Sequence, residues 1–259
     1  PGFDQIAQGM GGLMSITGLP GQGPVRVGIP VADLTAGIFC AMGVLVALLE
    51  REQSGKGQWV RSSLLEAQIA MLDFQAARWL VDGEVPPQAG NDHPTSIPTG
   101  VFKTKDGYIN LAAAGQAIWE RLARALGADV LIGRPEFATA EGRSEHRKAL
   151  NEEIGKVTIN RTSAEWIELM NEAGVPCGPI YAMNEVFADP QVRHTGIAWP
   201  AQHPEKGAVH VVGQAVSLSR TPATLRTTSP ERGEHTDAVL KDLGYSGEEV
   251  TALREKQVI

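Results

Sequence analysis

The chain has 259 residues, of which 42% are hydrophobic and 20% are charged, and this composition excludes disordered and fibrous proteins. Its net charge of -7 at pH 7 argues against a surface that binds nucleic acid or an anionic membrane, because such surfaces need clustered lysine and arginine. The length allows one large domain or two modest ones around a sizeable core.

The cysteines and the first residues of the chain indicate its cellular compartment and its extent. Cys40 and Cys177 match no disulfide framework and no metal-ligand spacing, so we predict reduced thiols, no bound metal and a cytoplasmic protein. The chain begins with Pro1-Gly2, without a signal-peptide pattern, and enters a glycine-rich segment at once. We therefore expect further protein upstream.

The first third of the chain is predicted to alternate extended segments with helices. Apolar spacing predicts a helix within residues 1–18, and capping-box and turn residues mark the later boundaries. The order strand, helix, strand, helix indicates an α/β layer. The predicted elements are an extended segment at 25–31, a long helix from residue 33 to about 52, a strand at 58–62 and a helix at 63–80.

Asp33 stands at the mouth of the long apolar helix. A carboxylate there can accept hydrogen bonds from the free N–H groups of the first turn, and the positive end of the helix dipole favours its negative charge. The same description fits a structural cap and a carboxylate nucleophile, and the motif alone leaves both open. The apolar run at 36–49 is shorter than the roughly 18 residues that a membrane span needs, so we predict a buried core helix.

The rest of the chain is predicted to be mixed. A segment at 85–98 containing Pro, Gly, Asn and His is predicted to be a linker or a crossing loop, and it precedes a hairpin around Lys105-Asp106-Gly107. Helices follow, the last of this group opened by a capping box at Thr162 and Glu165. The later elements are helices at 117–125, 141–159 and 164–173, an extended run at 175–180, a short helix at 183–188, a hairpin at 209–218 turning at Gly213, and two C-terminal helices.

Four stretches of the chain carry recognisable motifs: residues 31–37, which lead into the apolar helix, 48–58, 175–180 with 185–192, and 233–245. The stretches are long, ordered and spread over nearly the whole chain, so chance is a poor explanation. Together they resemble the family III CoA-transferases, the group of formyl-CoA transferase and carnitine CoA-transferase that also contains the α-methylacyl-CoA racemases.

The resemblance implies an enzyme that moves CoA between an acyl-CoA thioester and a free carboxylic acid. In the family, the aspartate at the position of Asp33 is the nucleophile, and it passes through an aspartyl anhydride and an aspartyl-CoA thioester. Coenzyme A is then a substrate, and no permanently bound cofactor is expected. The expected partners are an acyl-CoA and an acceptor acid, with no nucleic acid and no membrane.

The resemblance also implies a fold. We expect an α/β protein with a Rossmann-like large domain, whose N-terminal part is absent from this chain, and a smaller α+β domain. The expected division is residues 1–88 in the large domain with Asp33, residues 89–190 in the small domain, and residues 191–259 returning to the large domain. Full-length relatives form interlocked dimers, so a homodimer is expected here.

The sequence leaves two alternatives to a transferase. The racemases pair their aspartate with a histidine about thirty residues upstream, because moving a proton at the α-carbon needs an acid and a base. Here that position is Phe3, which carries no proton. Asp4 beside it stands where some transferases have an acidic residue near the reaction centre, so it is a candidate substrate- or CoA-binding residue, or else a solvated charge at a helix start. The second alternative is an inactive fragment without affinity for CoA.

Further candidates are weaker. Gly115 and Gln116 lie where formyl-CoA transferases have a glycine loop, although a plain hairpin-to-helix turn fits equally well, and Lys56 in a Gly-Lys-Gly turn can meet a phosphate or simply face solvent. His93, His235 and Cys177 are interpreted as packing or capping residues, because none has a metal-ligand or nucleophile partner nearby.

Overall fold

The computed structural model describes residues 2–259, and Pro1, where the first predicted segment begins, lies outside the described residues. The chain divides into two compact units, of which the first ends at Ile180 and the second is Tyr181–Ile259. Mixed helix and strand content agrees with the predicted α/β class.

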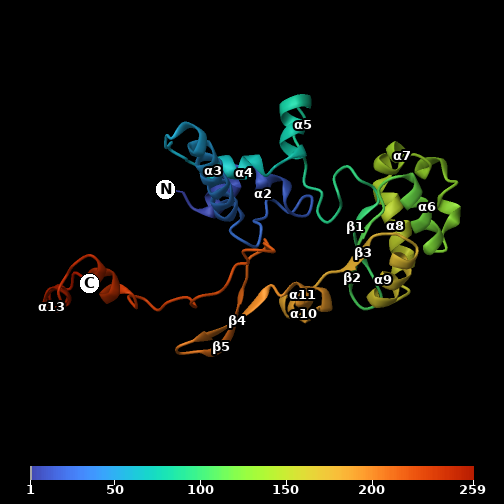
Figure 1. The fold of residues 1–259 in the computed structure, drawn as a ribbon. Helices are drawn as coiled ribbons and strands as arrows, with labels where there is room; N and C mark the ends of the chain where they lie inside the picture. The colour runs from blue at the N-terminus through green and yellow to red at the C-terminus, as the bar shows by residue number, and fades with distance from the viewer. Residues whose placement is uncertain (1) are drawn as a thin grey trace. The chain divides into compact units, whose positions relative to one another are not determined.

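The first part of the first unit is helical. Figure 1 shows the long helix α3 beside the shorter α1 and α4, and contacts join α3 to both of them. The prediction of helices here is confirmed, and Gly55 and Gly83 end two of them in the left-handed conformation that glycine adopts without strain. The helices are α1 (Asp4–Met10), α2 (Leu13–Ile16), α3 (Val31–Ser54), α4 (Leu64–Ala70) and α5 (Phe74–Asp82).

The strands predicted at 25–31 and 58–62 are not formed, so the alternating α/β order expected for residues 25–80 was wrong. An extended segment gains backbone hydrogen bonds only beside a second strand, and no strand lies within residues 2–98 to pair with these two. The helix predicted at 63–80 is also divided. Asp73 has a positive φ of 49°, which separates α4 from α5.

The second part of the first unit is a small antiparallel sheet covered by helices. The hairpin predicted around Lys105-Asp106-Gly107 is confirmed, with Phe102 opposite Ile109, and the third strand pairs Gly178 with Asn110. The sheet has the order β1 (Thr99–Lys103), β2 (Tyr108–Ala112), β3 (Cys177–Pro179), and the helices are α6 (Gln116–Ala125), η1 (Asp129–Leu131), η2 (Pro135–Phe137), α7 (Ala140–Glu145), α8 (Arg147–Thr158) and α9 (Ser163–Glu172).

Local signals explain most of this region. Alternate residues of β1 and β2 are buried, which is the period-two pattern of a sheet with one covered face. The capping box of Thr162 and Glu165 opens α9 as predicted. The helix predicted at 141–159 is instead divided at His146, whose backbone leaves the helical conformation. The shared core contains Ile109, Leu111, Trp119, Leu122, Phe137, Leu150, Ile154, Trp166 and Met170.

The second unit combines four helices with a two-stranded sheet. The helices are α10 (Met183–Ala188), α11 (Pro190–Thr195), α12 (Thr236–Asp242) and α13 (Gly247–Glu255), and the strands are β4 (Ala198–His203) and β5 (Gly207–Val212). The hairpin was predicted six to eleven residues too late in the chain, with its turn at Gly213. The turn lies instead between His203 and Gly207, where His203 Nδ1 accepts the N–H groups of Glu205 and Lys206 at 3.2 and 3.3 Å.

Helix α3 is longer and more exposed than predicted. It has 24 residues, a mean hydropathy of 2.1 over its most apolar window, and only 17% of that window is buried, so by length and composition it is able to cross a membrane. The prediction that it is a buried core helix is wrong for the described chain. Its buried residues, Ala32, Thr35 and Ala36, lie near its start. Large exposed side chains follow along it: Leu34, Ile38, Phe39, Met42, Val44, Leu45, Val46, Leu48 and Leu49.

Candidate functional site at the start of helix α3

The backbone at the start of α3 places Asp33 one turn into the helix. The N-cap residue is Pro30, which has no side-chain cap hydrogen bond, and Asp33 is the third helical residue. Its side chain is exposed, and no hydrogen bond or ion pair of its carboxylate is found within residues 2–259. The prediction that Asp33 caps this helix was therefore wrong.

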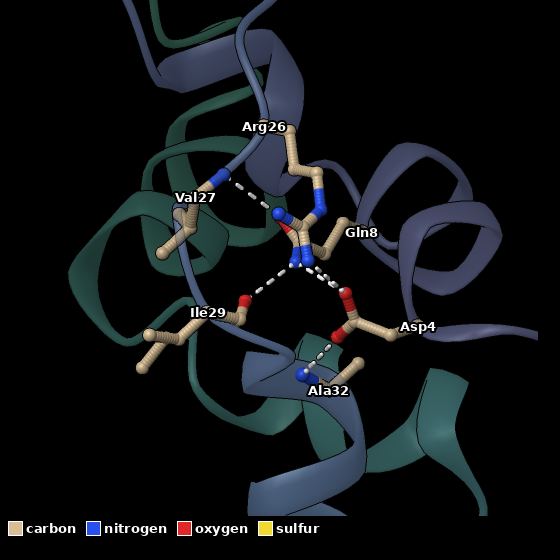
Figure 2. Close-up of polar contacts among 6 residues, drawn as sticks. All are labelled: Asp4, Gln8, Arg26, Val27, Ile29 and Ala32. Atoms are coloured by element: carbon tan, nitrogen blue, oxygen red, sulfur yellow. Dashed lines mark hydrogen bonds and ion pairs between the residues drawn. The ribbon is translucent and has the colours of Figure 1, made fainter.

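Asp4 supplies the cap from a different helix. Its Oδ1 accepts the N–H of Ala32 at 2.9 Å, and its Oδ2 accepts Gln8 Nε2 at 2.8 Å and Arg26 Nη2 at 3.4 Å (Figure 2). The carboxylate is buried, with only 8% of the residue exposed. A carboxylate at this position satisfies a first-turn N–H group and meets the positive end of the helix dipole.

This division of roles determines the available chemistry. Because Asp4 takes the capping hydrogen bond, the oxygens of Asp33 remain free for a reaction partner. Asp33 also projects from the first turn, where the helix dipole favours a negative charge and stabilises it. The arrangement combines one buried structural carboxylate with one exposed carboxylate that is free to attack an electrophile.

Sequence reasoning missed two residues of this network. Gln8 lies four residues after Asp4, a spacing that brings side chains together on a helix, so a signal was present in the sequence. Arg26 lies in the extended segment before α3 and carries no local signal, because its contact with Asp4 depends on the tertiary fold.

Gly115 and Gln116 form the turn from β2 into α6. Gly115 has a positive φ of 88° and is the N-cap residue, a conformation that favours glycine. Gln116 Oε1 accepts Arg143 Nη1 at 3.0 Å, and its Nε2 donates to Glu120 Oε1 at 3.1 Å. Burial lowers the pKa of Arg143, whose guanidinium stacks over Trp119. No hydrogen bond or ion pair within residues 2–259 joins this turn to Asp33.

Lys56 follows the opposite end of α3 from Asp33. At about 1.5 Å per helical residue, the 24-residue helix places its two ends roughly 35 Å apart. The side chain is exposed in a turn where its backbone N–H donates to Ser54 Oγ at 3.1 Å. The structure therefore places Asp4 against the backbone of Ala32, next to Asp33, and leaves Lys56 beyond the other end of the helix.

His93 and Cys177 have structural surroundings. His93 Nδ1 accepts the N–H groups of Thr95 and Ser96 at 3.2 and 3.0 Å, and its ring stacks on Phe74. Cys177 packs against the small-sheet core, and this burial raises the pKa of its thiol to about 11. His235 is exposed just before α12. Within residues 2–259 no group of His, Cys, Asp and Glu is arranged to hold a metal ion.

Cys177 is expected to react slowly with alkylating reagents. At pH 8 a thiol with a pKa of about 11 is ionised in about one molecule in a thousand, against about one in four for free cysteine. Iodoacetamide labelling of the folded protein, followed by peptide mass spectrometry, should be at least about 100-fold slower at Cys177 than for free cysteine. Labelling in urea should restore the ordinary rate, and rapid labelling of the folded protein would contradict this account.

Comparison with known proteins identifies the family. The model of CoA-transferase family III matches residues 1–236, so the chain belongs to CoA-transferase family III. It is 34% identical over 260 residues to succinyl-CoA–D-citramalate CoA-transferase of Chloroflexus aurantiacus, covering 100% of this chain and 65% of that protein. It is 33% identical over 242 residues to human succinyl-CoA:glutarate CoA-transferase, covering 93% of this chain and 55% of that protein.

A solved structure gives the same result. The crystal structure of a CaiB/BaiF family protein from Brucella suis superposes with a TM-score of 0.80 at 30% identity, covering 93% of this chain and 63% of that one. The suspected family is thereby confirmed. The chain spans 55 to 65% of the length of the two curated relatives named above.

Proposed function

We propose that the complete protein transfers coenzyme A between an acyl-CoA thioester and a free carboxylic acid, with Asp33 as the nucleophile. The observation that carries this proposal is the exposed Asp33 carboxylate in the first turn of α3, whose capping role is taken by Asp4. Membership of CoA-transferase family III supports the same reaction class. A racemase is less consistent with the residues, because Phe3 beside Asp4 has no proton to exchange.

The proposed reaction has four covalent steps. An Asp33 oxygen attacks the thioester carbonyl, the C–S bond breaks, and the CoA thiolate leaves an aspartyl acyl anhydride. The thiolate attacks the Asp33 carbonyl carbon and releases the first acid as a carboxylate, which leaves an aspartyl-CoA thioester. The acceptor carboxylate attacks this thioester and frees the thiolate, forming a second anhydride. The thiolate then attacks the acceptor's carbonyl carbon and regenerates the Asp33 carboxylate.

Succinyl-CoA is the proposed donor class, with a dicarboxylic acid as acceptor. This part of the proposal rests on the relatives, which are named for succinyl-CoA with D-citramalate and with glutarate. Coenzyme A acts as substrate throughout, and the chemistry that Asp33 performs requires no permanently bound cofactor or metal.

We also propose the domain organisation and assembly expected from the family. The single core shared by residues between Ile97 and Val175 supports a small domain at 89–190. Residues 1–88 and 191–259 then belong to a Rossmann-like large domain, completed by protein outside this chain. The exposed apolar side chains of α3 support an assembly that covers them, which we propose to be the remaining part of a homodimeric transferase.

Trapping the covalent intermediate tests the nucleophile. The complete protein is incubated with succinyl-CoA and quenched with hydroxylamine, which converts an aspartyl anhydride or thioester into a hydroxamate that peptide mass spectrometry locates. We expect the label on Asp33 and none on the nearby Asp4, whose oxygens are already hydrogen-bonded. Label on another residue, or no label during active transfer, would refute the assignment.

A further inference from the structure

Gln8 is buried within the helical part of the first unit and uses both ends of its amide. Its Nε2 donates to Asp4 Oδ2 at 2.8 Å and to the Ile29 carbonyl at 3.2 Å, and its Oε1 accepts the Val27 N–H at 3.0 Å. Figure 2 shows these contacts converging on one side chain. Since an N–H only donates and a carbonyl only accepts, the partners also fix the orientation of the amide.

These hydrogen bonds tie α1 to the segment that leads into α3. Val27 and Ile29 belong to the extended segment immediately before α3, and this segment has no neighbouring strand with which to form regular hydrogen bonds. Gln8 gives this segment two of the hydrogen bonds that a neighbouring strand would provide: it accepts the Val27 N–H, and it donates to the Ile29 carbonyl, which also accepts the Val31 N–H at 2.8 Å.

The same amide holds the helix cap in place. Asp4 Oδ1 accepts the Ala32 N–H, and Asp4 Oδ2 accepts a hydrogen bond from Gln8 Nε2. Each oxygen of the capping carboxylate is therefore held by a hydrogen bond. Ala32 is buried and directly precedes Asp33. The position of the Ala32 backbone fixes where the first turn begins, and that start determines the direction in which the Asp33 side chain projects.

We propose that Gln8, acting through Asp4, is a positioning residue that sets the direction of the Asp33 carboxylate; this proposal rests on the proposed function of Asp33 as nucleophile. Gln8 touches no reacting atom. Its effect is on the rate at which a bound acyl-CoA is attacked, because a small displacement of a nucleophile lowers the fraction of productive encounters without changing the distant binding contacts.

The variant Gln8→Met tests this in the complete protein, since methionine keeps the length of the side chain and loses all three hydrogen bonds. Gln5→Met on the exposed side of the same helix is the matched control. With succinyl-CoA and glutarate, we expect Gln8→Met to lower kcat about 10- to 100-fold per folded molecule, with KM within about two-fold. The control should keep both constants within about two-fold. A normal kcat per folded molecule, or a change in KM alone, would overturn the proposal.

Two further measurements keep the test decisive. If Gln8→Met fails to fold, Gln8→Glu keeps the Val27 contact and replaces only the donating nitrogen; the same loss of kcat is expected, and normal kcat again counts against the proposal. Amide hydrogen exchange of residues 31–33 needs no activity, and we expect it to rise at least about ten-fold in the folded variant. Unchanged exchange overturns the proposal, whereas a wild-type protein without any Asp33 adduct overturns the proposed function instead.

Discussion

Replacement of Asp33 by asparagine is expected to lower kcat for CoA transfer by at least about a thousand-fold, because the amide has no anionic oxygen to attack the thioester. The change keeps the size of the side chain. Since Asp33 makes no capping hydrogen bond, the helix should be retained, and the melting temperature should stay within about 3 °C of the wild-type value. Steady-state transfer from succinyl-CoA and thermal unfolding by circular dichroism measure the two quantities.

The matched control is Glu50→Gln, which removes an exposed carboxylate from the last turns of the same helix. It should transfer CoA at the wild-type rate. Undiminished transfer by Asp33→Asn would remove Asp33 from the mechanism. A large loss of folded protein in Asp33→Asn would show instead that this carboxylate has a structural role, contrary to the cap that Asp4 provides.

The elements that the sequence predicted well are those with local signals. The capping box at Thr162 opens α9, and the alternating residues around Asp106-Gly107 form the β1–β2 hairpin. In each case the residues that decide the structure lie within a few positions of one another. The turn between β4 and β5 was misplaced because Gly213 is a strong turn residue in isolation, whereas His203 and Gly207 make the actual turn.

The candidate site was predicted in part for the same reason. Asp33 could be named as a candidate, since it stands at a recognisable helix start and, by the resemblance, at the family's nucleophile position; its role as nucleophile stays a prediction. Its capping role was wrong because the cap comes from Asp4, 28 residues before Ala32, through a contact that only the tertiary fold creates. The exposure of α3 was missed for a related reason. A helix that is apolar on all sides is predicted to be buried, but its sequence does not identify the protein surface that covers it.

A charged substitution on the exposed apolar surface of α3 is expected to prevent assembly of the protein. Leu45 is 62% exposed here, in the middle of the apolar surface of α3. If the complete protein covers this surface, Leu45→Asp places a charge in an apolar interface, which costs at least about 3 kcal/mol and should prevent assembly. We expect soluble yield to fall sharply, with any remaining protein outside the dimer peak in size-exclusion chromatography coupled to light scattering.

Leu45→Met is the control, because it conserves volume and apolar character, and it should assemble as the wild type does. Comparison of the two variants distinguishes three environments for α3. A covered protein interface tolerates methionine and rejects aspartate, with the wild type purifying as a dimer without detergent. A solvent-exposed helix tolerates both changes. A membrane-embedded helix also rejects aspartate, but its wild type requires detergent for extraction, and that requirement would contradict the proposed assembly despite the helix's hydropathy of 2.1.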